Sequence, residues 1–326
     1  MPGILGLLWS QLFYTPKCPP KDSFLDKVVI VTGANTGLGL EATRHFVRAG
    51  ASKVILACRT LGKGEMAKKD VEKTEGRTGV LEVWQLDMSE YASVQSFAHK
   101  CQQELPRIDA VVQNAGFWTM DFALAQGHER SITVHVLSTM MLALLLLPPM
   151  RASAAKTGSR AYMTIVTSET HEFNKFSERK SPKTFAALDD EKTAIMKERY
   201  GVSKLLQILA VRHLTQAVIQ DTSKFPVLNL VTPSLCRTGL AKGVFVADVL
   251  NFFLGRTAEV GSRTYVNAVG PIGEDSMGGY IVDDRVCDPA PFVLSQEGSQ
   301  VAERVWLELV DILEEACPGV TRNIAA

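Results

Sequence analysis

The sequence predicts an α/β protein with one doubly wound, parallel β-sheet, and three observations support this fold class. Short β-branched runs alternate with helical patterns from about Lys27 onward, which is typical of βαβ units covered on both faces. A glycine-rich turn joins the first of these strands to the first helix. The 326 residues, 46% of them hydrophobic and 21% charged, can bury one large core, and no linker or repeat marks a domain boundary.

Seven apolar runs are predicted to be strands. They are Val28–Thr32, Val54–Cys58, Leu81–Leu86, Ala110–Asn114, Ala161–Thr167, Val227–Val231 and a seventh near Gly279–Val282 that closes the sheet. Between them, helices are expected to begin near Leu38, Gly62, Glu90, His128 and Lys197. Each is long enough for a right-handed crossover, so ligands should bind beyond the carboxyl ends of the strands. We therefore expect one domain at residues 24–326, with a seven-stranded parallel sheet, after a short N-terminal extension at residues 1–23.

Two apolar segments are too short to span a bilayer. The first, residues 1–14, lacks the basic region of a cleavable signal; it either packs on the domain or forms an interfacial anchor that gives weak membrane association. The second, Met140–Met150, ends at Pro148-Pro149 and is predicted to be a buried helix. No transmembrane segment is therefore expected.

Composition narrows the range of partners. Lys+Arg and Asp+Glu both total 35, so no basic surplus indicates nucleic acid, and a small neutral partner is favoured. The six cysteines include no C-x-x-C pair and the histidines form no H-E-x-x-H, which argues against a disulfide framework and against a metal site. A reducing, cytoplasmic setting fits best.

The glycine-rich turn is the strongest local signal. It reads T-G-A-N-T-G-L-G, a G-x-x-x-G-x-G variant of the dinucleotide-binding pattern, between a buried strand and a helix. Glycine lets the backbone turn tightly and approach a pyrophosphate at the helix N-terminus. The predicted cofactor contacts are Gly33, Asn35, Thr36, Gly37, Leu38 and Gly39. A merely structural turn is the alternative.

The second strand ends on a cation. Where an NAD-preferring site offers an acid to the ribose hydroxyls, this chain offers Cys58, Arg59 and Thr60. Arg59 can pair with a 2′-phosphate, which favours NADP(H), and Lys63 is a possible second cation. An ordinary solvated arginine is the alternative.

A tyrosine and a lysine lie four residues apart on a later helix. This spacing puts Tyr200 and Lys204 on one face. Such a pair is common by chance and would alone indicate a surface contact. Its weight comes from the preceding strand, which ends at Thr167-Ser168.

Taken together, these motifs resemble the short-chain dehydrogenase/reductase family. The ordered set is the glycine-rich turn, Asp87, Asn114-Ala115-Gly116, Ser168, Tyr200 with Lys204, and Pro233, and it spans residues 24 to 316. Ala57-Cys58-Arg59 and Met277-Gly278-Gly279-Tyr280 look most like the retinol-dehydrogenase-like reductases, including many from fungal secondary metabolism. The resemblance implies a Rossmann fold and an NADP-dependent oxidoreductase.

The resemblance also implies roles for single residues. Tyr200 would protonate a carbonyl oxygen, Lys204 would lower the pKa of that phenol and hold the nicotinamide ribose, and Ser168 would donate a hydrogen bond to the substrate oxygen. The cofactor would be met by Asp87 at the adenine, by Asn114, Ala115 and Gly116 along the adenosine side, and by Pro233 and Thr238 at the nicotinamide amide. For Asp87 a role at the start of the next helix is equally plausible. A homodimer through the apolar helices at about 128–150 and 197–220 is expected.

Two positions depart from the family pattern. His135 stands where an asparagine usually helps to hold a water chain to the lysine; it could keep that relay, contact substrate or weaken the relay. Thr232-Pro233-Ser234 replaces the usual Asn-Pro-Gly, and Ser234 takes a positive φ less readily than glycine, so the loop is expected to run differently.

A long segment separates Ser168 from Tyr200. Its aromatic residues Phe173, Phe176 and Phe185, with His171, are predicted to form an apolar pocket together with Phe117, Trp118 and the region 245–253, or else to be packed lid and core. The leading hypothesis is an NADP-dependent oxidoreductase that interconverts a carbonyl and a secondary alcohol on a hydrophobic metabolite, in secondary metabolism. Two alternatives stay open: a repurposed member that catalyses a non-redox isomerisation, cyclisation or elimination, and a non-catalytic NADPH-binding protein.

Overall fold

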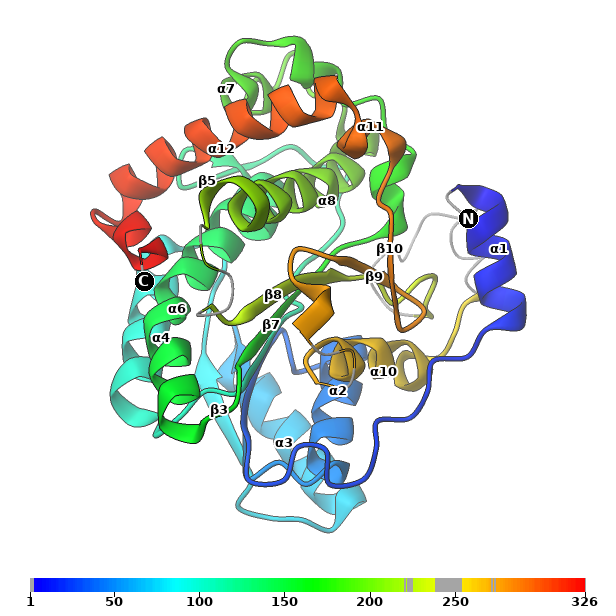
Figure 1. Ribbon diagram of the computed structural model, residues 1–326, viewed down its shortest axis with the longest axis vertical. Coiled ribbons are helices and arrows are strands. Elements are labelled where there is room, and N and C mark those ends of the chain that lie inside the picture. The colour runs from blue at the N-terminus through cyan, green and yellow to red at the C-terminus, as the bar shows by residue number, and fades with distance from the viewer. Residues whose placement is uncertain are drawn as a thin grey trace.

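The computed structural model describes residues 3–219, 221, 225–237, 254–270, 272 and 274–325. Its main sheet has eight strands in the order β10-β9-β8-β7-β4-β1-β2-β3 (Figure 1). They are β1 Val28–Thr32, β2 Lys53–Cys58, β3 Leu81–Gln85, β4 Ala110–Gln113, β7 Tyr162–Val166, β8 Val227–Val231, β9 Tyr280–Val282 and β10 Arg285–Cys287. The seven predicted strands are confirmed, and all of their pairings are parallel.

The eighth strand was not predicted. β10 pairs antiparallel with β9 across a tight turn at Asp283 and Asp284, whose φ angles are 51° and 58°. Aspartate is one of the few residues that tolerate this left-handed conformation. Because β10 has only three residues, all exposed, no buried apolar run reveals it in the sequence.

Helices cover both faces of the sheet. On one face lie α4 Tyr91–Glu104, α6 Ser138–Thr157 and α8 Met196–His213, with α12 Gln296–Ala316 outside α8; on the other lie α2 Gly37–Arg48, α3 Leu61–Glu75 and α10 Ala258–Ala268 (Figure 1). The five predicted helices are therefore confirmed. Each face has its own apolar core, as a doubly wound sheet requires.

The helix that leads into α6 is continuous but irregular. A short α5, Arg130–Ile132, passes through a π-helical turn, Thr133–Leu137, into α6. The stretch Arg130–Thr157 is long and apolar enough to cross a membrane, but 89% of its most apolar window is buried inside the fold. The prediction of a buried helix is confirmed. The prediction that it ends at Pro148-Pro149 is wrong, because core packing outweighs the two missing N–H donors and the helix runs on to Thr157.

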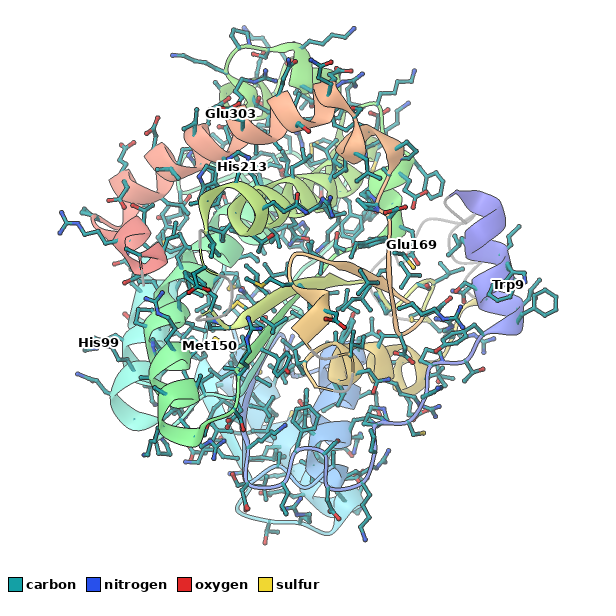
Figure 2. All side chains as sticks on the ribbon, viewed as in Figure 1. Trp9, His99, Met150, Glu169, His213 and Glu303 are labelled. Atoms are coloured by element: carbon teal, nitrogen blue, oxygen red, sulfur yellow. The ribbon has the colours of Figure 1, made fainter. Side chains whose placement is uncertain are left out.

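The N-terminal extension packs on the domain. It begins with α1, Ile4–Phe13, and Nη2 of the buried Arg256 holds α1 by donating to the Ser10 and Tyr14 carbonyls at 2.9 and 3.0 Å. The first interpretation of this segment is therefore confirmed. The outer side of α1 is apolar and exposed, with Trp9 pointing away from the sheet (Figure 2). The interfacial anchor stays a prediction.

A two-stranded hairpin and several short helical turns complete the described fold. β5 Leu124–Ala125 and β6 His128–Glu129 pair before α5. The other short elements are η2 Glu169–Glu172, η3 Ser177–Lys180, α7 Thr184–Leu188, η4 Leu214–Val218, η6 Glu274–Ser276, α11 Pro291–Leu294 and η7 Val320–Ile324.

Candidate active site

The glycine-rich turn leaves room for backbone only. Gly33 and Gly37 have positive φ angles of 66° and 59°, and a Cβ at Gly39 would lie 2.6 Å from both the Asn114 amide nitrogen and the Gly33 carbonyl oxygen. Thr36, at the N-terminus of α2, makes no side-chain cap and the first turn has no acid. The N–H groups of this turn therefore face a space suited to an anion.

Asn114 fixes the turn from the neighbouring strand. Its Nδ2 donates to the Thr32 carbonyl at 2.9 Å, while the backbone N–H groups of Asn114 and Ala115 donate to Thr32 Oγ1 at 3.0 and 2.9 Å. The structure thus places Asn114 behind the turn, where it shapes the binding surface without lining the adjacent cavity.

A cavity of about 520 Å³ lies beside the turn and is formed by residues from five parts of the chain. Seven of the predicted cofactor residues line it: Gly33, Asn35, Arg59, Lys63, Asp87, Ala115 and Gly116. The sequence prediction therefore brought together residues that are far apart in the chain. Thr36, Gly37, Leu38 and Gly39 lie next to it, at the start of α2.

The cations at this cavity have no acidic partner in the described part of the chain. Among the described residues, no ion pair or hydrogen bond involves the side chains of Arg59 or Lys63, and both residues are exposed. Sequence reasoning missed a third cation, Arg130, whose guanidinium lies 5.2 Å from the centre of the Phe117 ring and whose Nε is buried without a partner. Only the fold brings Arg130 here, since no motif marks it.

Asp87 supports both of its interpretations. Its Oδ1 accepts hydrogen bonds from the backbone N–H and hydroxyl of Ser89, at 2.9 and 2.6 Å, which shapes the turn before α4. The same residue also lines the cavity. The carboxyl group can therefore organise the turn and meet a ligand at once.

Ser168, Tyr200 and Lys204 converge beyond the end of β7. The Ser168 side chain lies close enough to the Tyr200 phenol to lower its pKa, and the Lys204 ammonium lies 5.5 Å from the centre of the Tyr200 ring. Lys204 Nζ donates to the Val166 carbonyl at 2.8 Å. The three side chains predicted to cooperate are thus adjacent.

The pKa values at this cluster differ from the expectation. Burial raises the pKa of Tyr200 well above its ordinary value, and the Glu169 carboxylate adds to this, while the Ser168 hydrogen bond lowers it. Burial also lowers the pKa of Lys204 to about 7. The predicted lowering of the Tyr200 pKa by Lys204 is therefore not found, because burial disfavours the charged form of both groups.

His135 is wholly buried, and both of its ring nitrogens are occupied. Nε2 accepts the Phe117 N–H at 3.1 Å, so the ring proton is on Nδ1, which donates to Ser203 Oγ at 2.8 Å. Burial lowers the pKa of His135 far below its ordinary value, and Lys204 adds to this. The neutral His135 ring thus links the Phe117 loop to α8 through hydrogen bonds, and it lies beside the Tyr200 ring.

The turn after β8 keeps a conformation that glycine favours. Ser234 has a φ of 59°, so the expected change in the course of the loop is not found. Its hydroxyl donates to Glu169 Oε1 at 2.6 Å, and Thr232 Oγ1 bonds the other carboxylate oxygen. Pro233 lies buried between them, and Thr238 falls outside the described residues. Sequence reasoning missed Glu169. The hydroxyl residues Thr232 and Ser234, which replace the usual asparagine and glycine, were a signal that this turn has a hydrogen-bonding partner.

The aromatic residues between Ser168 and Tyr200 do not form a pocket. Phe176 and Phe185 are 1% and 2% exposed and belong to the main core, while Phe173 is 48% exposed on the surface. His171 is buried, and its ring bridges the Ser168 carbonyl and the Ala290 N–H at 2.7 and 3.0 Å. The alternative of packed lid and core is therefore correct here, and the region 245–253 lies outside the described residues.

Sequence comparison identifies relatives along the whole chain. A family model described as short chain dehydrogenase matches residues 27–172. The short chain dehydrogenase/reductase dmxR8 of Cryptosporiopsis sp. (strain 8999) is 44% identical over 98% of this chain and 100% of its own length. The short-chain dehydrogenase anuD of Penicillium roqueforti (strain FM164) is 40% identical over 97% of this chain and 84% of its own length.

Solved structures share the fold at low sequence identity. An NADPH-bound carbonyl reductase from chicken fatty liver superposes with a TM-score of 0.62 and 17% identity, covering 81% of this chain and 99% of the other. A short chain dehydrogenase from Salmonella enterica serovar Typhi gives 0.60 and 20%, covering 82% and 99%. From its fold, its converging side chains and its relatives, the chain belongs to the short-chain dehydrogenase/reductase family and is an oxidoreductase of that family.

Proposed function

We propose that the protein is an NADP-dependent reductase that converts a carbonyl on a hydrophobic metabolite into a secondary alcohol. The observation that carries the proposal is the convergence of Ser168, Tyr200 and Lys204 at the same edge of the sheet as the glycine-rich turn and its cavity. Because its relatives are fungal enzymes, we further propose a role in secondary-metabolite biosynthesis.

The choice of NADP(H) rests on charge. Arg59 and Lys63 line the cavity beside the turn and have no acidic partner among the described residues. A 2′-phosphate there would supply the missing anion, and Arg130 is a further cation that lines the same cavity. The related chicken reductase, which was solved with NADPH, is consistent with this choice.

The residues of the chain supply the proton chemistry. When bound, the reduced nicotinamide supplies a hydride for the carbonyl carbon. The Tyr200 phenol is protonated at neutral pH, and this is the form that donates a proton to the carbonyl oxygen. Ser168 can donate a second hydrogen bond to that oxygen, and Lys204 can stabilise the phenolate that remains.

We propose a second cavity, of about 510 Å³, as the place for the substrate. It lies between α1, η2 and the β9–β10 hairpin, and its wall includes Glu169 from beside the catalytic cluster. Leu7, Tyr14 and Tyr280 give it apolar surfaces, while Arg212 and Asp288 give it polar ones. Such a wall suits a ring-containing metabolite that also bears polar groups.

The direct test follows NADPH and NADH oxidation with a panel of lipophilic ketones. We expect turnover with NADPH, a product heavier than the ketone by two hydrogens, and a fall of at least about 100-fold in kcat for Tyr200→Phe, since general acid catalysis contributes 10²–10⁴-fold. Tyr162→Phe, at the opposite end of β7, is the matched control and should retain activity. No turnover with any ketone, or a Tyr200→Phe variant as active as the parent, would contradict the proposal.

A non-redox reaction is disfavoured by the two departures that suggested it. His135 is neutral and fully hydrogen-bonded, and Ser234 keeps the backbone conformation that glycine would adopt. Neither residue presents a free group for new chemistry. Product mass distinguishes the two reactions, because conversion without net cofactor consumption would indicate isomerisation or elimination.

A further inference from the structure

Glu169 joins two parts of the active site that are far apart in the sequence. It follows Ser168 directly and begins η2, a 3-10 turn, while its carboxylate reaches the turn after β8. Both oxygens are used there: Oε1 accepts from Ser234 Oγ at 2.6 Å and Oε2 accepts from Thr232 Oγ1. The Glu169 carboxylate therefore connects the segment that carries Ser168 to both ends of the Thr232–Ser234 turn.

The turn needs this support because of Ser234. Its φ of 59° lies in the left-handed region, which is costly for a residue with a Cβ. Ser234 is held there by its hydroxyl bond to Glu169 and by the bond from its N–H to Thr232 Oγ1 at 3.2 Å. Because Thr232 is itself bonded to Glu169, the strained turn and the carboxylate form one connected unit.

The position of this unit suggests its purpose. Pro233 is buried at the centre of the turn, and the family resemblance puts that residue against the nicotinamide amide. Glu169 also lies close enough to Tyr200 for its charge to act on the phenol. We propose that Glu169 is a positioning residue that holds the Thr232–Ser234 turn in the conformation that receives the nicotinamide. This inference rests on the proposed function.

A direct role of Glu169 in catalysis fits the geometry less well. Both carboxylate oxygens already accept hydrogen bonds from hydroxyl groups of the same chain, which leaves the carboxylate less free to act on a substrate. It lines the second cavity, however, and the experiment must therefore separate cofactor positioning from contact with substrate.

The test compares two ligands that differ in the nicotinamide ring. NADPH contains the nicotinamide, whereas 2′-phospho-ADP-ribose carries the same adenosine, phosphates and ribose without it. We expect Glu169→Ala to weaken NADPH binding about 10-fold, the loss of one charge-assisted hydrogen-bond unit, and to leave 2′-phospho-ADP-ribose within about twofold of the parent. Both affinities are measured by calorimetry, without any substrate, so contact with substrate cannot contribute.

A double-mutant cycle tests the mechanism. Gly at position 234 adopts the left-handed conformation without support, so the loss caused by Glu169→Ala should shrink to about threefold or less in a Ser234→Gly background. Glu169→Gln, which keeps the shape and one acceptor, should lie between the parent and Glu169→Ala, and it replaces the alanine variant if that one fails to fold.

Three results would decide against the inference. Equal weakening of both ligands would indicate a general structural role, and unchanged NADPH affinity would indicate that the turn is held without Glu169. An effect of Glu169→Ala that is the same size in the Ser234→Gly background would remove the proposed mechanism. A parent protein that binds neither ligand would instead overturn the proposed function, and this inference with it.

Discussion

At the scale of single residues, the proposed choice of NADP(H) depends on Arg59. It is exposed at the carboxyl end of β2, lines the first cavity and has no ion-pair partner among the described residues. We expect Arg59→Ala to weaken NADPH binding about 10- to 100-fold, since a charge-assisted hydrogen bond contributes ~1.5–3 kcal/mol, and to leave NADH binding nearly unchanged.

The control for Arg59 is another exposed cation on the same side of the sheet. Lys73→Ala, near the end of α3, removes a positive charge away from the cavity. Its NADPH affinity should match the parent when titrations are made at one salt concentration. If Arg59→Ala weakened NADPH and NADH equally, the residue would not distinguish the two cofactors.

A buried histidine makes stability depend on pH. Burial lowers the pKa of His171 from 6.5 to about 4, although its bond to the Ser168 carbonyl acts the other way. Above pH 6.5 the ring is neutral in both the folded and the unfolded chain, so it contributes nothing. Below that pH the unfolded chain binds a proton and the folded chain does not. We expect this residue to remove up to about 3 kcal/mol of stability as the pH falls from 6.5 to 4.

Urea denaturation at a series of pH values measures this effect. His171→Gln removes the titrating ring, so its free energy of unfolding should fall less steeply than that of the parent between pH 6.5 and 4. His99→Gln, on the exposed side of α4, is the matched control and should keep the parent slope. Identical slopes for the parent and His171→Gln would contradict the assignment.

The residues that sequence could predict are those that carry a motif. Gly33, Ser168, Tyr200 and Lys204 have defined spacings and positions relative to strands, so the pattern found them. Glu169 belongs to no motif, and it matters through hydroxyl groups more than 60 residues away, which only the fold brings near. The raised pKa of Tyr200 could not be predicted from the sequence either, because it depends on the burial of the side chain.

At the scale of elements, the buried cation Arg256 is one of the groups that hold α1 on the domain, together with the bonds from the Gly3 N–H to Glu172 and from the Tyr14 hydroxyl to Asp284. Besides the Ser10 and Tyr14 carbonyls, Ser10 Oγ and Asp283 Oδ1 in the β9–β10 hairpin lie within 3.0 Å of Arg256 Nη2, so its two N–H groups are shared among four acceptors. We expect Arg256→Ala to destabilise the protein by ~3–5 kcal/mol, because it leaves Asp283 buried without its partner, and to free α1.

Thermal unfolding and limited proteolysis with thermolysin measure these two consequences. The variant should have a lower Tm than the parent and should be cut faster between α1 and β1. Arg322→Ala, which removes an exposed arginine from η7, is the control for a lost positive charge. Cleavage of Arg256→Ala at the parent rate would show that α1 is held by other contacts.

Elements were predictable where burial leaves a periodic pattern. The long strands and helices bury one or both faces, so their apolar spacing is visible in the sequence. The short β10 strand and the π-helical turn at Thr133–Leu137 have no such pattern, since an exposed three-residue strand and one widened turn follow from tertiary packing. The positive φ of Ser234 likewise follows from its partners.

At the scale of the whole molecule, the C-terminal helix covers the surface expected to form a dimer. α12 packs along α8, where the His213 and Trp306 rings lie 6.0 Å apart (Figure 2), and the apolar first half of α6 is buried in contact with α4 and η7. The apolar character of both helices, which suggested a homodimer, is thus accounted for within one chain. The homodimer stays a prediction, but the apolar character of these two helices no longer supports it.

Sedimentation equilibrium distinguishes a monomer from a homodimer. Because α6 and α8 have little apolar surface left for a partner, we expect a mass near the 35.7 kDa of one chain at micromolar concentration. Trp306→Ala, which opens the α8–α12 contact, should lower the stability by about 3–5 kcal/mol and promote association. A stable dimer of the parent would show that another surface, such as the outer side of α1, forms the interface.

The position of α12 also affects how the enzyme should be assayed. All of the described groups that would hold cofactor or move a proton come from one chain, and the helix that covers α8 belongs to that chain as well. Specific activity should therefore stay constant on serial dilution into the nanomolar range. The rate per molecule would then not depend on how much of the protein is present.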